Sequence, residues 1–298
     1  MVIVIVGPTG VGKTKLSIEL AKKLNGEIIN ADSTQVYKTL DIGTAKIKEE
    51  EKEGIVHHLL DIKDIDEDYT VYDYQKDARR CIDEIIKKNK TPIMVGGTGL
   101  YIKAALYDYK FNDEDNKNYI DESLSDDELY EMLLSIDKDT TIHKNNRKRV
   151  IRALNSYYKN GYVKKDVTDK LLYDAVFIGL TTDRTTLYER INKRVDVMVE
   201  EGLINEALNI YNSNVRGKAV LTPICYKELF PYFENEKTLD ECLDDIRSKS
   251  RKYAKRQYTW NKHQFNVNWF DVDFENFHNT VNDIEEFIKN EKDVKNLP

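Results

Sequence analysis

Short apolar runs alternate with amphipathic segments over the first hundred residues. The run Val2–Val6 consists only of valine and isoleucine, as expected for a strand that is buried on both faces of a parallel sheet. Leucines four residues apart predict a helix over 13–24, and a capping pattern at Thr70 predicts the start of another. Apolar runs at 27–31 and 92–95 predict two further strands. This alternation predicts an α/β fold with ligand sites at the carboxyl ends of the strands.

The pattern changes after residue 105. Residues 110–172 are rich in Asp, Asn, Lys and Tyr, and they show helical periodicity without a convincing strand. The remaining predicted elements are a strand at 175–180, a helix at 182–202 and another through 210, a long helix at 238–262, a strand at 267–270 and a terminal helix after 276. We therefore predict a core domain of 1–109 and 173–298, interrupted by a helical insertion domain of 110–172.

Charge is distributed unevenly along the chain. The 298 residues carry a formal net charge of −7, which by itself argues against a nucleic-acid partner. Residues 143–155, however, contain five Lys or Arg and no acid, and residues 247–262 contain seven and no acid. On a helix over 238–262, the seven cations fall on the arc opposite Leu243 and Trp260. Two interpretations of these stretches are open: each is a basic face that only contacts solvent, or each is a surface that binds nucleic-acid phosphates.

The cysteines and the hydropathy of the chain indicate in which cellular compartment the protein is found. Cys81, Cys225 and Cys242 are odd in number and widely spaced, which is typical of free thiols in a reducing environment. No apolar run approaches the roughly 20 residues that cross a bilayer. We expect a cytoplasmic protein without a membrane partner.

The motif with the clearest chemistry follows the first strand. The segment Gly7-Pro8-Thr9-Gly10-Val11-Gly12-Lys13-Thr14 satisfies G-x-x-x-x-G-K-[ST] between a predicted strand and a predicted helix. Its glycines allow backbone N–H groups to face an anion, Lys13 neutralises phosphate charge, and Thr14 would bind Mg²⁺. The sequence therefore predicts a P-loop kinase-like parallel sheet flanked by helices, a bound phosphate group, and Mg²⁺ as cofactor.

The acids near this loop leave the reaction open. The strand at 92–95 ends in Gly96-Gly97-Thr98 without the carboxylate that an ATPase usually places there. Asp32, at the end of the second strand, is positioned as a general base for an acceptor, or else it is only a turn residue. A small-molecule kinase and a transferase that releases diphosphate fit these residues equally well.

Several further motifs occur in one order. They are NADSTQVY at 30–37, DIGTAK at 41–46, HHLLDI at 57–62, GGTGLY at 96–101, IH-x-N and R-x-x-RAL within 142–154, and AKRQYTW at 254–260. Together with the phosphate loop they resemble the tRNA dimethylallyltransferase (tRNA isopentenyltransferase) family over about 1–260. The resemblance implies that a dimethylallyl group moves from its diphosphate to the N6 amine of the adenosine 3′-adjacent to the anticodon of tRNA.

The resemblance also implies roles for residues. Asp32 would accept the proton of the amine, with Lys13 and Thr14 completing the catalytic set, and residues 7–14 would hold the diphosphate. Arg190 and Arg194 stand where related kinases keep lid arginines, which by analogy assigns them to the diphosphate. The implied tRNA contacts are Asp32, Ser33, Thr34, Gln35, Thr98, Lys148, Arg149, Val150, Ile151, Arg152, Lys255, Arg256, Gln257 and Trp260. The implied partners are the anticodon stem-loop of tRNA and dimethylallyl diphosphate. We expect the protein to be a monomer.

The chain departs from the family pattern at a few positions. Cys225 stands where glycine is usual, and Asn146 stands where aspartate is usual. The adjacent His57 and His58 point to different sides of a strand or helix, so packing or hydrogen bonding is favoured over a metal pair. Three other functions stay open: an ATP-dependent small-molecule or nucleoside kinase, an adenylate isopentenyltransferase, and a non-catalytic RNA-binding P-loop protein.

Overall fold

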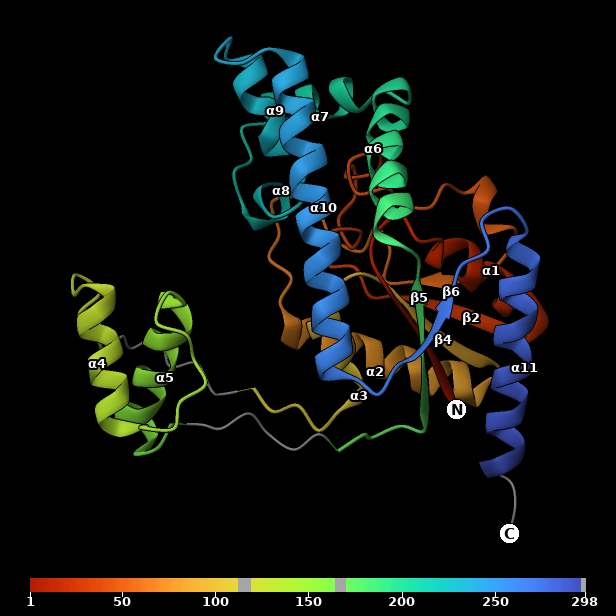
Figure 1. Ribbon diagram of the computed structural model, residues 1–298, viewed down its shortest axis with the longest axis horizontal. Helices are drawn as coiled ribbons and strands as arrows, with labels where there is room; N and C mark the ends of the chain where they lie inside the picture. Colours follow the sequence, from red (N-terminus) through yellow and green to blue (C-terminus); the bar gives the residue numbers. More distant parts are fainter. Residues whose placement is uncertain (112–118, 164–169, 296–298) are drawn as a thin grey trace. The chain divides into compact units, whose positions relative to one another are not determined.

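A computed structural model describes residues 1–111, 119–163 and 170–295, with the side chains of 294 and 295 excluded. The described residues divide into two compact units, one formed by Met1–Tyr107 with Leu171–Pro298 and the other by Asp108–Lys170. The first unit contains the sheet (Figure 1).

The sheet has six parallel strands in the order β3-β2-β4-β1-β5-β6. Their bounds are β1 Val2–Val6, β2 Gly26–Asn30, β3 His57–His58, β4 Thr91–Val95, β5 Ala175–Thr181 and β6 Asn268–Asp271. The predicted α/β class and five of these strands are confirmed. The short edge strand β3 is missing from the sequence prediction because two residues carry no periodicity.

Helices cover both faces of the sheet, and β1 shows why its residues are all apolar. Val2, Val4 and Val6 pack into a cluster with α2 (Val71–Lys87) and α3 (Gly99–Leu106). The alternate residues of β1, Ile3 and Ile5, pack into a second cluster on the other face, with α1 (Lys13–Lys23) and α11 (Phe277–Lys295). Because successive strand residues point to opposite faces, a strand between two helical layers needs an apolar residue at every position.

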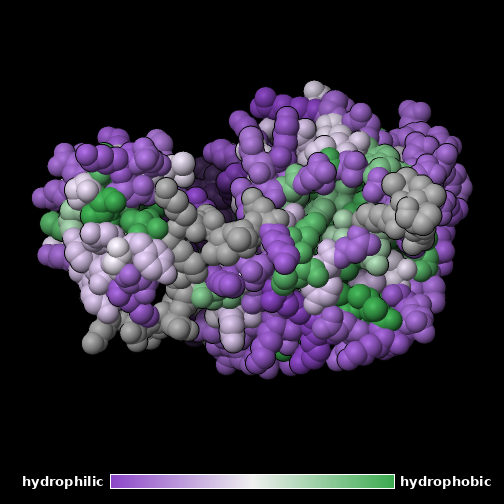
Figure 2. All heavy atoms as spheres, turned by 90° about the horizontal axis from the view of Figure 1, so that it is seen from below, coloured by the Kyte–Doolittle hydropathy of each residue, from purple (hydrophilic) through white to green (hydrophobic). Residues whose placement is uncertain are grey.

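A third cluster joins Val36, Tyr37 and Leu40, which follow β2, to helices that come after β5 in the chain. These helices are α6 Arg184–Glu200, α7 Leu203–Asn212, α8 Lys218–Leu221, α9 Tyr226–Phe233 and α10 Leu239–Gln264. Helix α10 begins in this layer and reaches the sheet near α3 (Figure 1). Its 26 residues confirm the long predicted helix, including the capping box at Thr238, whereas α8 and α9 were not predicted. Hydrophilic residues predominate on the face of the larger unit that Figure 2 shows, and hydrophobic ones form separate patches.

The second unit has its own small core. Helices α4 (Asp126–Ile136) and α5 (Arg147–Asn160) pack around Leu129, Leu133 and Leu154. Its bounds, Asp108–Lys170, lie two residues from each end of the insertion expected at 110–172. None of the helices in the described ranges combines the length and apolar character needed to cross a membrane.

Candidate active site

The loop between β1 and α1 has the backbone geometry of a phosphate cradle. Gly7 and Gly12 adopt φ values of +142° and +100°, which L side chains rarely reach. A Cβ at Gly7 would lie 2.6 Å from the Leu180 carbonyl oxygen, and one at Gly12 would lie 3.0 Å from the Phe277 ring. The loop therefore needs glycine at both positions, and helix α11 packs directly against it.

Lys13 lies inside this loop and carries an altered acidity. Its ammonium donates a hydrogen bond to the Pro8 carbonyl at 2.8 Å. Burial, together with the neighbouring Arg194, lowers the pKa of Lys13 to about 8, although Asp32 opposes this shift. A diphosphate placed beside Lys13 would raise that pKa again, because an opposite charge favours the ammonium form.

Asp32, which follows β2, uses its two carboxylate oxygens differently. Oδ1 accepts hydrogen bonds from the Thr34 N–H at 2.9 Å and from the Thr34 hydroxyl at 2.7 Å. Among the residues that the structure describes, Oδ2 has no hydrogen-bond partner, and it lies 3.2 Å from the position of a Cβ at Gly97. The turn role and the position for a general base therefore coexist in one side chain.

Asn30 holds the Asp32 turn in place. Its buried side-chain amide accepts a hydrogen bond from the Asp32 N–H and donates to the Asp32 and Leu59 carbonyls. The hydroxyl of Tyr74 donates to the Asn30 carbonyl at 3.0 Å. These supports were not predicted, although Asn30 opens the NADSTQVY motif and was available as a signal.

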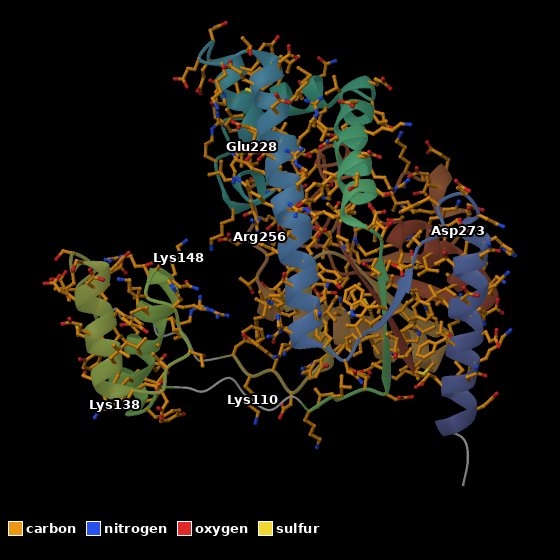
Figure 3. The ribbon with its side chains drawn as sticks, viewed as in Figure 1. Lys110, Lys138, Lys148, Glu228, Arg256 and Asp273 are labelled. Atoms are coloured by element: carbon orange, nitrogen blue, oxygen red, sulfur yellow. The ribbon has the colours of Figure 1, made fainter. Side chains whose placement is uncertain are left out.

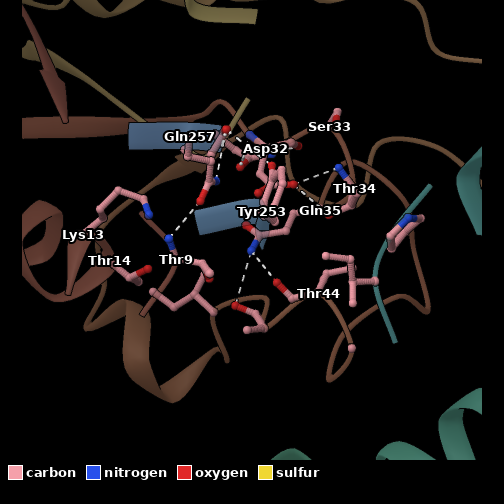
Figure 4. A pocket seen from close by; sticks show the side chains of 18 of the residues that line it. Thr9, Lys13, Thr14, Asp32, Ser33, Thr34, Gln35, Thr44, Tyr253 and Gln257 are labelled. Atoms are coloured by element: carbon pink, nitrogen blue, oxygen red, sulfur yellow. Dashed lines mark hydrogen bonds between the residues drawn. The ribbon is translucent and has the colours of Figure 1, made fainter. Parts of the chain in front are cut away.

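One cavity of about 360 Å³ joins these groups. Figure 4 shows Thr9, Lys13 and Thr14 on one side of it and Asp32 to Gln35 on another. Its wall includes the apolar side chains Ile28, Ile47, Leu60, Val95, Ile191, Val195, Met198, Pro223 and Ile224. The cavity can hold a phosphate group and a small hydrocarbon group together.

The two predicted arginines both reach the phosphate loop from α6. Arg190 donates to the Gly10 carbonyl at 3.0 Å and stacks on the Phe274 ring, 3.8 Å from its centroid. Arg194 lines the cavity and lies 3.4 Å from the Thr9 hydroxyl. Their position beside the loop agrees with the expected one, while their role toward a diphosphate stays a prediction.

The structure changes the interpretation of two residues on α10. The Gln257 side chain is buried, and its amide is bonded to Thr9 and Gly97. Trp260 packs against α3, where a Cβ at Gly99 would lie 2.2 Å from the indole ring. The Gln257 side chain is therefore a buried hydrogen-bonding residue that also lines the cavity, and its contact with tRNA stays a prediction. The half-buried Trp260 is a packing residue.

The basic arc of α10 is also less uniform than predicted. Arg247 pairs with Asp196 and Asp244 at 2.6 and 2.7 Å. Lys249 pairs with Glu228 at 3.1 Å, and Arg251 donates to Asn192 at 2.6 Å (Figure 3 labels Glu228 and Arg256). Arg247 and Lys249 are thus paired with acids, of which Asp196 and Glu228 come from other helices, and Arg251 is bonded to a neutral amide. A charge count along the chain could not reveal these partners from other helices.

The second half of the arc has a different environment. Lys252, Lys255 and Lys262 are exposed and form no hydrogen bond or salt bridge within the described part of the chain. Arg256 is exposed as well, and it also lines the cavity. These four cations are the part of the arc that is available to an external anion.

Two of the sequence motifs meet at a buried lysine. The Lys46 ammonium bonds to Asp41 of DIGTAK and to Asp61 of HHLLDI, each at 2.6 Å, and to the Tyr37 carbonyl. Glu206 of α7 accepts hydrogen bonds from the backbone N–H groups of residues 41–43. These motifs therefore shape the wall of the cavity, and no local pattern signalled the part played by Glu206.

The two histidines of HHLLDI point to different partners. His57 lines the cavity with Nδ1 2.9 Å from the Ile55 carbonyl, and burial lowers the pKa of its imidazole. His58 bonds to the buried Glu27 at 2.7 Å. Lys88 and Lys90 also bond to this carboxylate, and the three partners outweigh its burial and hold the pKa of Glu27 at about 2. The predicted hydrogen-bonding role is confirmed, and the described residues contain no cluster of three metal-ligating side chains.

Cys225 occupies a position that suits glycine. Its φ of +113° lies outside the range that L side chains prefer, its thiol is buried, and it lines the cavity. Burial beside Glu228 raises the pKa of this thiol to about 12. The backbone geometry supplies a physical reason for glycine at this site.

In the second unit, the predicted RNA-contacting residues of α5 separate by face. Lys148, Arg149 and Arg152 are exposed (Figure 3 labels Lys148). Val150 is only 1% exposed and Ile151 packs on the same core. The prediction of a tRNA contact is therefore wrong for the Val150 side chain, because consecutive helical residues cannot all face outward. Asn146 precedes α5 without capping it through its side chain.

The chain matches known proteins along most of its length. The sequence model of the IPP transferase family matches residues 35–264. The chain belongs to the IPP transferase family. It is 50% identical to the tRNA dimethylallyltransferase of Anoxybacillus flavithermus over 97% of this chain and 96% of the relative. It is 48% identical to the tRNA dimethylallyltransferase of Bacillus subtilis over 91% of this chain and 90% of the relative.

Solved structures of this family share the fold. A tRNA delta(2)-isopentenylpyrophosphate transferase from Staphylococcus epidermidis superposes with a TM-score of 0.75 at 41% identity, covering 97% of this chain and 99% of the other. A eukaryotic dimethylallyltransferase acting on tRNA gives a TM-score of 0.84 at 30% identity, covering 100% of this chain and 80% of the other. The resemblance inferred from the sequence motifs is thereby confirmed.

Proposed function

We propose that the protein transfers a dimethylallyl group from dimethylallyl diphosphate to the N6 amine of the adenosine 3′-adjacent to the anticodon of tRNA, and releases diphosphate. One observation carries this proposal. A single cavity is lined by residues of the phosphate loop, by Asp32 and by several apolar side chains. Family membership supports the same reaction, because the relatives named above are tRNA dimethylallyltransferases.

The residues of the cavity divide the chemistry between them. The lone pair of the N6 amine attacks C1 of the dimethylallyl group, and the bond between C1 and the diphosphate oxygen breaks. Asp32 Oδ2 takes the proton that the amine loses, as a general base. Lys13, Arg194 and the loop N–H groups stabilise the charge that grows on the departing diphosphate. The adenosine must leave its stack to reach this cavity.

We propose that Mg²⁺ accompanies the diphosphate and neutralises part of its charge. Thr14 offers a hydroxyl at the start of α1 that lines the cavity. The described residues form no carboxylate cage for a metal. This donor set fits Mg²⁺, which keeps several waters and is commonly held by one or two protein groups together with phosphate oxygens.

The RNA would be held by the charge of exposed cations. We propose that Lys148, Arg149 and Arg152 of α5 and Lys255 and Arg256 of α10 contact phosphates of the anticodon stem-loop. We also propose a cytoplasmic monomer, because one chain carries the donor loop and the base, and its three free cysteines are buried. Light scattering on the purified chain tests the oligomeric state.

A transfer assay with three arms tests the function. Purified protein is incubated with radiolabelled dimethylallyl diphosphate and either unmodified tRNA or free AMP, and separately with labelled ATP and nucleoside acceptors. We expect label to enter tRNA alone, at the adenosine beside the anticodon. Label in AMP would favour an adenylate isopentenyltransferase, and phosphate transfer from ATP would favour a kinase.

A further inference from the structure

The Gln257 side chain links three segments that are far apart in the sequence. Its Oε1 accepts a hydrogen bond from the Thr9 N–H of the phosphate loop at 2.9 Å, across 248 residues. Its Nε2 donates to the Gly97 carbonyl after β4 at 3.1 Å, across 160 residues. Figure 4 shows the Gln257 side chain beside Thr9, with a dashed line for the hydrogen bond between them. Both polar ends of one buried side chain are therefore used inside the protein.

The chemistry of the two contacts fixes which way the amide points. A carbonyl oxygen accepts the N–H of Thr9 and an NH₂ group donates to the C=O of Gly97, and only a primary amide supplies both. The space around Gly97 is equally restrictive, since a Cβ there would lie 2.3 Å from Gln257 Nε2 and 3.2 Å from Asp32 Oδ2. Gln257 and Asp32 therefore both lie next to Gly97.

These contacts connect the donor side of the cavity to its acceptor side. Thr9 belongs to the loop that would hold the diphosphate, and Gly97 follows the strand that pairs with β2, where Asp32 begins its turn. A Cβ at the adjacent Gly96 would lie 2.1 Å from the Ala31 carbonyl carbon, so the two strand ends are already in van der Waals contact. Movement of the phosphate loop relative to Gly97 would therefore change the distance from donor to base.

We propose that Gln257 is a positioning residue that fixes the phosphate loop relative to Asp32, and so sets the alignment of the dimethylallyl carbon with the acceptor amine. This inference rests on the proposed function. Displacing a reacting group by about 1 Å can cost on the order of 10²-fold in rate, because a near-attack geometry requires the reacting atoms to be close and aligned. Gln257 acts through the loop and touches no reacting atom.

The experiment compares Gln257→Met with Gln264→Met in the transfer assay. Methionine has a similar length and suits a helix, but it makes neither hydrogen bond. Gln264 lies on the same helix outside the cavity, where it accepts a hydrogen bond from Lys103 at 2.7 Å. We expect kcat to fall about 10- to 100-fold in Gln257→Met, with tRNA affinity within about twofold of wild type. Gln264→Met should keep wild-type values of kcat and of both KM.

A second variant separates positioning from mere folding. Gln257→Glu keeps an oxygen for the Thr9 N–H, loses the donor to Gly97 and adds a negative charge beside the diphosphate. We therefore expect kcat to fall at least as far as in Gln257→Met, and KM for dimethylallyl diphosphate to rise, in a protein that still folds. Weaker tRNA binding with unchanged kcat would show instead that Gln257 contacts RNA. Unchanged kcat in folded Gln257→Met or Gln257→Glu would also overturn the inference. Failure of the wild-type protein to modify tRNA would overturn the proposed function, which is a separate outcome.

Discussion

The cavity and the exposed cations of α5 and α10 are built in opposite ways. In the cavity, Asp32 and Gln257 are bonded to neighbours that fix their geometry. Outside it, Lys255 and Lys148 are exposed and have no hydrogen bond or salt bridge among the described residues. The first arrangement suits a step that depends on alignment, and the second suits the binding of a polyanion through charge. Changes in the two regions should therefore affect different kinetic constants.

The largest expected effect lies in the cavity, at Asp32. Asp32→Ala should lower kcat by about 10²- to 10⁴-fold, the usual contribution of a general base, with little change in either substrate affinity. Asp32→Asn is the sharper variant because its amide oxygen can still accept the two bonds from Thr34. A kcat for Asp32→Asn near that of wild type would show that Asp32 serves only the turn.

Lys13→Ala should have the next largest effect, and it should act on the donor. Removal of the ammonium should lower kcat/KM for dimethylallyl diphosphate by about 10²-fold, as the loss of a group that stabilises transition-state charge does. Affinity for tRNA, measured by filter binding, should stay within about twofold. Equal losses for donor and tRNA would contradict the separation of the two regions.

The exposed cations should show the reverse behaviour. Arg256 also lines the cavity, so Lys252→Ala/Lys255→Ala is the cleaner pair on α10, with Lys148→Ala/Arg152→Ala as its counterpart on α5. Each pair should weaken tRNA binding about tenfold and reduce the slope of log affinity against log salt by up to about two. Pyrophosphate affinity should not change. An unaltered salt slope would identify the altered helix as a solvated face.

The pH dependence of donor binding gives a smaller effect. The pKa of Lys13 in the free protein is lowered to about 8, and bound diphosphate would raise it, so the site binds the protonated form. Affinity for pyrophosphate should therefore fall as pH rises through 8, by about fourfold between pH 7 and 8.5. Calorimetry on wild type and Lys13→Ala checks this, because the ratio of their affinities removes the ionisation of pyrophosphate itself.

Cys225 offers the smallest effect. Cys225→Gly relieves a strained positive φ, worth about 1–3 kcal/mol, and loses a small buried side chain, so the free energy of unfolding should change by less than about 1 kcal/mol. Cys242→Gly is the control, since it lies in α10 and is fully buried. It should cost about 2 kcal/mol through helix propensity and a cavity. Chemical denaturation measures both, and equal losses would show that the φ of Cys225 stores no strain.

The features that could be predicted from the sequence are those determined by residues close together in the chain. The strand at Val2–Val6, the phosphate loop and the capping boxes at Thr70 and Thr238 were predictable, because neighbouring residues determine each of them. The neutralisation of Arg247 by Asp196 and the burial of Gln257 were not, because their partners come from other elements. The basic arc of α10 was therefore predicted as one surface and is observed as two halves.

The contact between Thr9 and Gln257 also bears on how the chain folds. During synthesis the phosphate loop leaves the ribosome 248 residues before the side chain that supports it. Phe277 and helix α11, which pack against Gly12, follow later still. Contacts of such long sequence separation form slowly, because a large loop must close before they stabilise anything. The nascent protein thus carries its phosphate-binding sequence long before it has a finished binding site, and ligand binding to the loop should appear only near the end of folding.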